Sequence, residues 1–159
     1  MSEVPDNFYQ RLDYQLLRNG PVNLYYSPDL LEQDLNTLKE LKYEIDEFDC
    51  SGWKNPAEMH EQIARKLDFP EYYGKNLDAL NDCLSAIEIP EMSGRALVFR
   101  RFEMFSAIEP KVAWNLLDII AHNAWTHLVW NERLFAMVQS SDPNIRFDNL
   151  GSHSASWKN

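Results

Sequence analysis

The stretch FPEYYGKNLDALNDCL, residues 69–84, carries the strongest pattern in the chain. A short loop with two adjacent tyrosines leads through Gly74 into a segment of mixed polar and apolar residues. The leucines of this segment recur at helical spacing: Leu77, Leu80 and Leu84. This spacing predicts a helix that turns one apolar face toward a core and leaves its other face to solvent.

Two aspartates, Asp78 and Asp82, are four residues apart and therefore share a face of the predicted helix, one turn from each other. Like charges at this spacing cost a helix roughly a few tenths of a kcal/mol. The commonest explanation of such a pair is a solvated helix face. A general acid–base pair is the alternative, but the sequence shows neither an apolar pocket around the carboxylates nor a second catalytic group that would separate two carboxyl pKa values.

Outward from this stretch, short apolar strands alternate with amphipathic helices. Ser27-Pro28 and Asn55-Pro56 each place a capping residue directly before a proline, which is a helix-start signal. The expected strands lie at residues 22–26, 43–48, 95–102 and 134–138. The expected helices lie at residues 29–42, 56–67, 77–87 and 110–128. Such alternation predicts βαβ units, and hence an α/β fold with a mostly parallel sheet.

Composition limits the classes of function. The chain has 159 residues, 25 of them acidic and 15 basic, which gives a formal charge of −10. This charge argues against a protein that coats nucleic acid and favours a basic protein partner. The N-terminus lacks the basic and apolar regions of a secretory signal, and no apolar run is long enough to span a membrane. Cys50 and Cys83 lack metal-ligand spacing, so we expect buried thiols in a cytoplasmic protein without metal or cofactor.

The quoted stretch resembles the barstar-like family of intracellular ribonuclease inhibitors. The similarity is carried by the strings Pro70–Gly74, Asn76–Leu80 and Asp82–Leu84. It continues backward without a gap to Phe48 and forward more weakly, and covers residues 43–140. The resemblance implies a small, mostly parallel sheet of three or four strands packed by about five helices.

The similarity leaves two further segments to explain. Residues 1–42 are expected to form an extension of one strand and one helix, packed on the barstar-like domain of residues 43–140. The simplest role of this extension is to add a parallel strand that protects a sheet edge, and a second binding surface is the alternative. Residues 141–159 form a polar tail, whose last part, residues 151–159, we expect to be frayed.

The resemblance also implies a function: an inhibitor or immunity protein, not an enzyme, that blocks a basic microbial nuclease in a 1:1 complex. A ribonuclease is the expected partner, with no direct contact to nucleic acid or membrane. By position, Asp82 is the central carboxylate, lying where a substrate phosphate would lie, and Asp78 faces the enzyme's basic residues. The other loop residues of this set contact the partner or shape the loop: Tyr72, Tyr73, Gly74 and Asn76. A carboxylate on a rigid helix suits this task, because nuclease sites gather Arg, Lys and His around phosphate.

Three members of the partner-binding set depart from the family's pattern. Asn81 and Ile87 stand where the family has tryptophans, and the loss of aromatic anchors favours weaker binding or a different partner. His122 corresponds to a glutamate of the family, and both a pH-sensitive contact and an ordinary surface histidine remain open. The alternative function is therefore a barstar-fold interaction module whose partner is a DNase toxin or a regulatory protein. An enzyme that uses Asp82, Cys83 and a histidine is the third hypothesis, with the least support.

Overall fold

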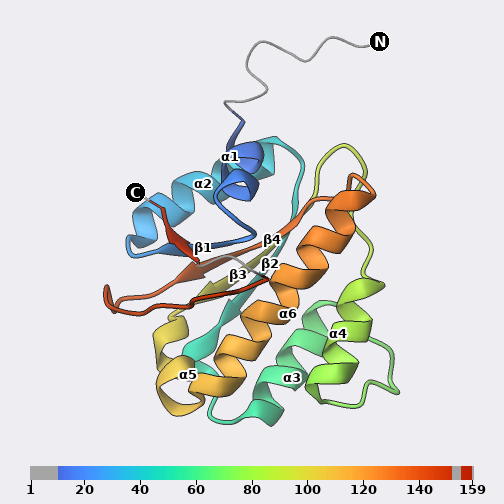
Figure 1. Cartoon of the computed structure of the whole chain (residues 1–159), viewed down its shortest axis with the longest axis vertical. Helices are drawn as coiled ribbons and strands as arrows, with labels where there is room; N and C mark the ends of the chain where they lie inside the picture. Colours follow the sequence, from blue (N-terminus) through green and yellow to red (C-terminus); the bar gives the residue numbers. More distant parts are fainter. Residues whose placement is uncertain (1–10, 152–154, 159) are drawn as a thin grey trace.

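The computed structural model describes residues 11–151 and 155–158. Figure 1 shows a sheet with helices on both faces, α1 and α2 on one and α3 to α6 on the other. The helices are α1 Leu12–Arg18, α2 Pro28–Glu40, α3 Pro56–Lys66, α4 Leu77–Ser85, α5 Phe102–Ile108 and α6 Pro110–Val129, with a 3-10 turn, η2, at Cys50–Gly52. The strands are β1 Val22–Tyr25, β2 Glu44–Asp49, β3 Arg95–Arg100, β4 Leu134–Gln139 and β5 Ser156–Trp157. No helix in this part of the chain is long and apolar enough to cross a membrane.

The strands lie in the order β2-β3-β4-β1-β5, and each neighbouring pair is parallel. Four strands of four to six residues form the main sheet, and β5 adds two residues at one edge. The predicted α/β class with a mostly parallel sheet is therefore confirmed. Strand β4 lies in the middle and is buried along its whole length, which explains the apolar run from Leu134 to Val138.

The helix-start signals act as predicted. The Ser27 hydroxyl accepts a hydrogen bond from the backbone N–H of Leu30 at 3.2 Å, and Asn55 Oδ1 accepts one from Glu58 at 2.9 Å. The Glu58 carboxylate in turn accepts a hydrogen bond from the backbone of Lys54 at 2.7 Å, which closes a reciprocal cap. These caps fix where α2 and α3 begin.

The larger core lies between the sheet and helices α3 to α6. The rings of Phe48 on β2 and Phe99 on β3 stack at a centroid distance of 5.2 Å, and Trp53 packs against both. Leu80 and Leu84 place one face of α4 in this core, as their spacing predicts. The opposite face of α4 is thereby held rigidly at the surface.

The segment before the barstar-like region forms part of the sheet. Strand β1 pairs with β4 on one side and with β5 on the other, so it covers the edge that β4 would otherwise expose. The strand and the helix after it were predicted; helix α1 was not. Helix α1 is attached through Asp13, whose carboxylate accepts a hydrogen bond from Tyr43 Oη at 2.9 Å.

The expectation of a frayed C-terminal end is wrong for the described part of it. Ser156 and Trp157 pair in parallel with Asn23 and Leu24 of β1. Upstream, Phe147 and Leu150 are buried in the larger core, although the sequence around them is polar. These few apolar side chains and the pairing with the open edge of β1 hold the C-terminal segment on the fold. The polar composition of the segment predicts neither contact. Residues 152–154 and Asn159 lie outside the described residues.

Candidate protein-binding site

Helix α4 begins with a side-chain cap. Asn76 Oδ1 accepts a hydrogen bond from the backbone N–H of Ala79 at 2.8 Å, and Asn76 Nδ2 donates to the carbonyl of Gly74 at 3.3 Å. A Cβ atom at Gly74 would lie only 3.2 Å from Asn76 Nδ2, so glycine gives the capping amide its room. Lys75, between them, has a left-handed φ of 52°. Gly74 and Asn76 therefore shape the turn that leads into α4.

The two tyrosines of the loop point in opposite directions. The side chain of Tyr72 is 85% exposed, whereas Tyr73 is only 8% exposed and packs against Phe69. Tyr73 Oη lies 2.5 Å from Nδ1 of His60 on α3. Burial raises the pKa of Tyr73 and lowers the pKa of His60, so the phenol keeps its proton and donates a hydrogen bond to the neutral imidazole. Tyr73 thus fixes the loop to the core, and Tyr72 is the tyrosine available to a partner.

Asp78 and Asp82 are both exposed and lie on the face of α4 away from its buried leucines. Asp78 is in the first turn, where the helix dipole favours a negative charge. Among the described residues neither carboxylate has an ion-pair partner, unlike nearby Lys75, whose Nζ lies 3.4 Å from Glu61. The two carboxylates are therefore free to meet cations of another molecule.

Asp82 and Tyr72 also border a groove of about 720 Å³ between α4 and the edge strand β2. Five acidic side chains line it against two basic ones: Glu44, Asp46, Asp68, Asp82 and Glu88, with Lys66 and Arg95. The Arg95 guanidinium is already engaged, since its Nε donates to Asp46 at 2.7 Å and its Nη1 to the carbonyl of Glu88 at 3.0 Å. The groove therefore extends the acidic surface of α4 toward β2, a feature that sequence analysis missed.

The remaining three candidates lie in different places. Asn81 is exposed on α4, and its Oδ1 accepts a hydrogen bond from Asn123 of α6 at 2.9 Å. Ile87 is only 9% exposed and packs in the core, while it also lines the groove. His122 is exposed on α6, where its Nε2 lies 3.4 Å from Asp118. Asp118 in turn accepts a hydrogen bond from the backbone N–H of Gly151, which places His122 beside the C-terminal segment.

The geometry of Cys83 argues against a nucleophilic enzyme. Its thiol is partly buried, and burial together with the charge of Asp82 raises the pKa of that thiol. A reactive cysteine needs a lowered thiol pKa, because the thiolate is the nucleophile. Cys50, which burial likewise keeps protonated, lies wholly inside the core. Within the described ranges, no group of three or more His, Cys, Asp or Glu residues could hold a metal ion.

The chain is similar to a curated protein and, in fold, to a solved structure. The curated protein "Putative ribonuclease inhibitor YrdF" of Bacillus subtilis (strain 168) is 37% identical over 74 residues, which cover 46% of this chain and 77% of YrdF. Among solved structures, a chain of the structure of Drosophila ORC bound to AT-rich DNA and Cdc6 superposes with a TM-score of 0.55 at 14% identity. That match covers 87% of this chain but only 46% of the other, and it shows a shared fold alone.

The family comparison is more specific. The family model described as "Barstar (barnase inhibitor)" matches residues 43–138, from just before β2 to Val138 in β4. This range contains the tyrosine loop, α4 and both exposed aspartates. The description of the family names an inhibitor, and so does the name of the Bacillus relative. The chain therefore belongs to the barstar family.

Proposed function

We propose that this protein inhibits a basic microbial ribonuclease by placing its tyrosine loop and helix α4 in the enzyme's active-site cleft. The observation that carries the proposal is the position of Asp78 and Asp82. Both carboxylates are exposed one turn apart on a rigidly packed helix, next to the exposed ring of Tyr72. Asp82 takes the position of a substrate phosphate, and Asp78 meets a second basic group.

Rigidity is the physical basis of this mechanism. Asn76 caps α4, Leu80 and Leu84 anchor its inner face, and Tyr73 ties the preceding loop to His60. Because these elements are ordered before binding, little conformational entropy is lost when the partner docks. Guanidinium groups that normally bind phosphate meet carboxylates already in position, with strong charge-assisted hydrogen bonds.

Charge supports the choice of partner. The protein has a formal charge of −10, and the acidic groove beside α4 concentrates part of it near the proposed contact. Such a field accelerates encounter with a basic enzyme and disfavours acidic competitors. We infer a 1:1 complex in which the inhibitor needs no cofactor and makes no direct contact with nucleic acid. Its unpaired thiols suit a cytoplasmic immunity protein, which protects a cell from its own toxin or from that of a neighbour.

Titration of the purified protein into assays of small basic microbial ribonucleases tests the proposal. We expect stoichiometric inhibition of at least one enzyme, with activity falling linearly to an equivalence point near one inhibitor per enzyme. The assay should include any nuclease encoded beside the gene. Binding without inhibition would contradict occupation of the active site.

One observation favours a second candidate, an interaction module whose partner is a DNase toxin or a regulatory protein. Asn81 is engaged by Asn123, and Ile87 is nearly buried, so neither offers the aromatic anchor that often dominates an interface. Tyr72 is then the main aromatic contact of this face. Capture of a basic protein without ribonuclease activity, in a complex that Asp82→Ala weakens, would favour this candidate.

A further inference from the structure

A second cavity lies between helix α1 and the turn that joins α6 to β4. Its volume is about 310 Å³, which falls at the lower end of the range for small-molecule sites. None of its lining residues borders the acidic groove beside α4. It is therefore a separate feature, built by the N-terminal extension and the barstar-like region together.

The lining combines an apolar body with positive charge. Leu17 of α1 and Leu128 of α6 supply apolar walls, while Arg18 and Arg133 contribute two guanidinium groups against one carboxylate, that of Asp13. This local excess of positive charge stands out in a chain whose formal charge is −10.

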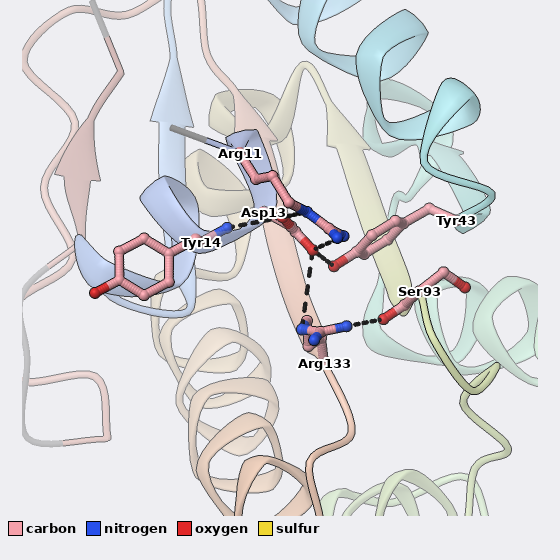
Figure 2. Close-up of polar contacts among 6 residues, drawn as sticks. All are labelled: Arg11, Asp13, Tyr14, Tyr43, Ser93 and Arg133. Atoms are coloured by element: carbon pink, nitrogen blue, oxygen red, sulfur yellow. Dashed lines mark hydrogen bonds and ion pairs between the residues drawn. The ribbon is translucent and has the colours of Figure 1, made fainter. Parts of the chain in front are cut away.

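The carboxylate of Asp13 is already hydrogen-bonded inside the protein. Asp13 is 2% exposed, and its oxygens accept hydrogen bonds from Arg11 Nε and Nη2 at 3.1 and 2.9 Å, and from Tyr43 Oη at 2.9 Å (Figure 2). Burial and the charge of Asp13 raise the pKa of Tyr43, so its hydroxyl stays a donor. Arg11 and Tyr43 make the hydrogen bonds to Asp13, and Arg133 forms a longer ion pair with it, so the cavity still carries two guanidinium groups, those of Arg18 and Arg133, against one carboxylate that is already hydrogen-bonded.

Arg133 is held in place before any ligand arrives. Its Nη1 donates to the carbonyl of Ser93 at 2.9 Å, and its Nε lies 3.9 Å from Asp13 Oδ2 (Figure 2). Arg18, at the rim, is exposed and forms no ion pair with another described residue. One fixed guanidinium beside one adaptable guanidinium is a suitable pair for a carboxylate.

We propose that this cavity binds a small carboxylate with an aromatic or compact apolar body. The apolar body lies against Leu17 and Leu128, and the carboxylate meets Arg133 and Arg18. Because α1 forms one wall and the α6–β4 turn the other, the bound molecule bridges the extension and the barstar-like region. Binding to the folded state alone then raises the unfolding temperature.

Phenylacetate is a suitable probe, with phenylacetamide as its uncharged match. We expect phenylacetate to shift the methyl NMR signals of Leu17 and Leu128 in a saturable way, and phenylacetamide to bind more weakly. Absence of any shift at 10 mM phenylacetate (a concentration roughly suited to the weakest measurable sites), or shifts that map to Ile87 beside α4, would overturn the proposal. Equal binding of the amide would also overturn it.

A matched pair of variants tests the role of charge. Arg18→Gln should weaken phenylacetate binding by about fivefold, the upper range for an exposed ion pair. Arg65→Gln removes another exposed arginine, on α3 and outside the cavity, and should leave the affinity unchanged. Both side chains are at the surface, so neither change should affect folding, and a melting curve of each variant checks this. Equal affinities of the two variants would contradict the assignment of Arg18.

Discussion

Tyr73 Oη and His60 Nδ1 lie 2.5 Å apart and join the partner-facing loop to helix α3 inside the core. The neighbouring Tyr72 projects into solvent from the same loop. One tyrosine therefore holds the loop while the other is presented to a partner, which separates stability from binding in two adjacent residues.

Tyr73→Phe should destabilise the protein by about 1 kcal/mol, because it leaves the buried imidazole of His60 without its partner. Urea unfolding measures this loss. Tyr72→Phe removes the hydroxyl of an exposed ring, so its free energy of unfolding should stay within about 0.5 kcal/mol of the parent value. Equal stabilities of the two variants would contradict the role of the buried hydrogen bond.

Stability should fall as the pH drops below about 6.5. Burial lowers the pKa of folded His60 from its ordinary value of 6.5, so the unfolded chain takes up a proton before the folded one does. The stabilisation is therefore present above pH 6.5 and is lost as the pH falls through the folded pKa. Unfolding free energies between pH 5 and 7.5 measure the slope, and His60→Gln should flatten it. An unchanged slope in that variant would assign the dependence to other groups.

Asp13→Ala should cost about 3 kcal/mol, because it leaves the buried Tyr43 hydroxyl and the Arg11 and Arg133 guanidinium groups without their shared carboxylate. Asp29→Ala removes an exposed aspartate from α2 and serves as the matched control. Thermal unfolding of both variants gives the comparison. A loss for Asp13→Ala no larger than the control's would show that α1 is not anchored through this carboxylate.

Phe147→Ala should destabilise the fold by about 3 kcal/mol, the usual cost of removing a buried phenyl ring. Phe147 is 4% exposed and packs edge-on against Phe102 at a centroid distance of 5.6 Å. Tyr26→Ala, at a ring that is 56% exposed, is the control. A loose C-terminal segment would instead make both substitutions nearly neutral in chemical denaturation.

Local signals made part of the fold predictable. The capping residues Ser27 and Asn55 predict the starts of α2 and α3, and the helical spacing of the leucines predicts α4. Helices α1 and α5 were missed, since each has only seven residues and no side-chain cap. Helix α5 follows Arg101 in a left-handed conformation with φ of 53°, which no sequence rule assigns to arginine.

The candidate site was predictable only where it is continuous in sequence. Tyr72, Asp78 and Asp82 lie in one stretch of the chain, and the exposure of the two aspartates follows from helical periodicity. Glu44 and Asp46 come from β2, 38 and 36 residues before Asp82, and come to line the same groove only in the folded tertiary structure. The inward turn of Tyr73 depends on His60, a tertiary contact that two adjacent tyrosines do not reveal.

The proposal that Asp82 takes the position of a substrate phosphate is tested most directly by measuring how well the Asp82→Ala variant inhibits a basic ribonuclease. Asp29→Ala is the control of equal charge. We predict that Asp82→Ala weakens inhibition by at least about thirtyfold, the level of an interface hot spot, while its melting curve stays near that of the parent protein. Asp29→Ala should inhibit as the parent does. Equal inhibition by the two variants would contradict the assignment of Asp82 as the phosphate-mimicking carboxylate.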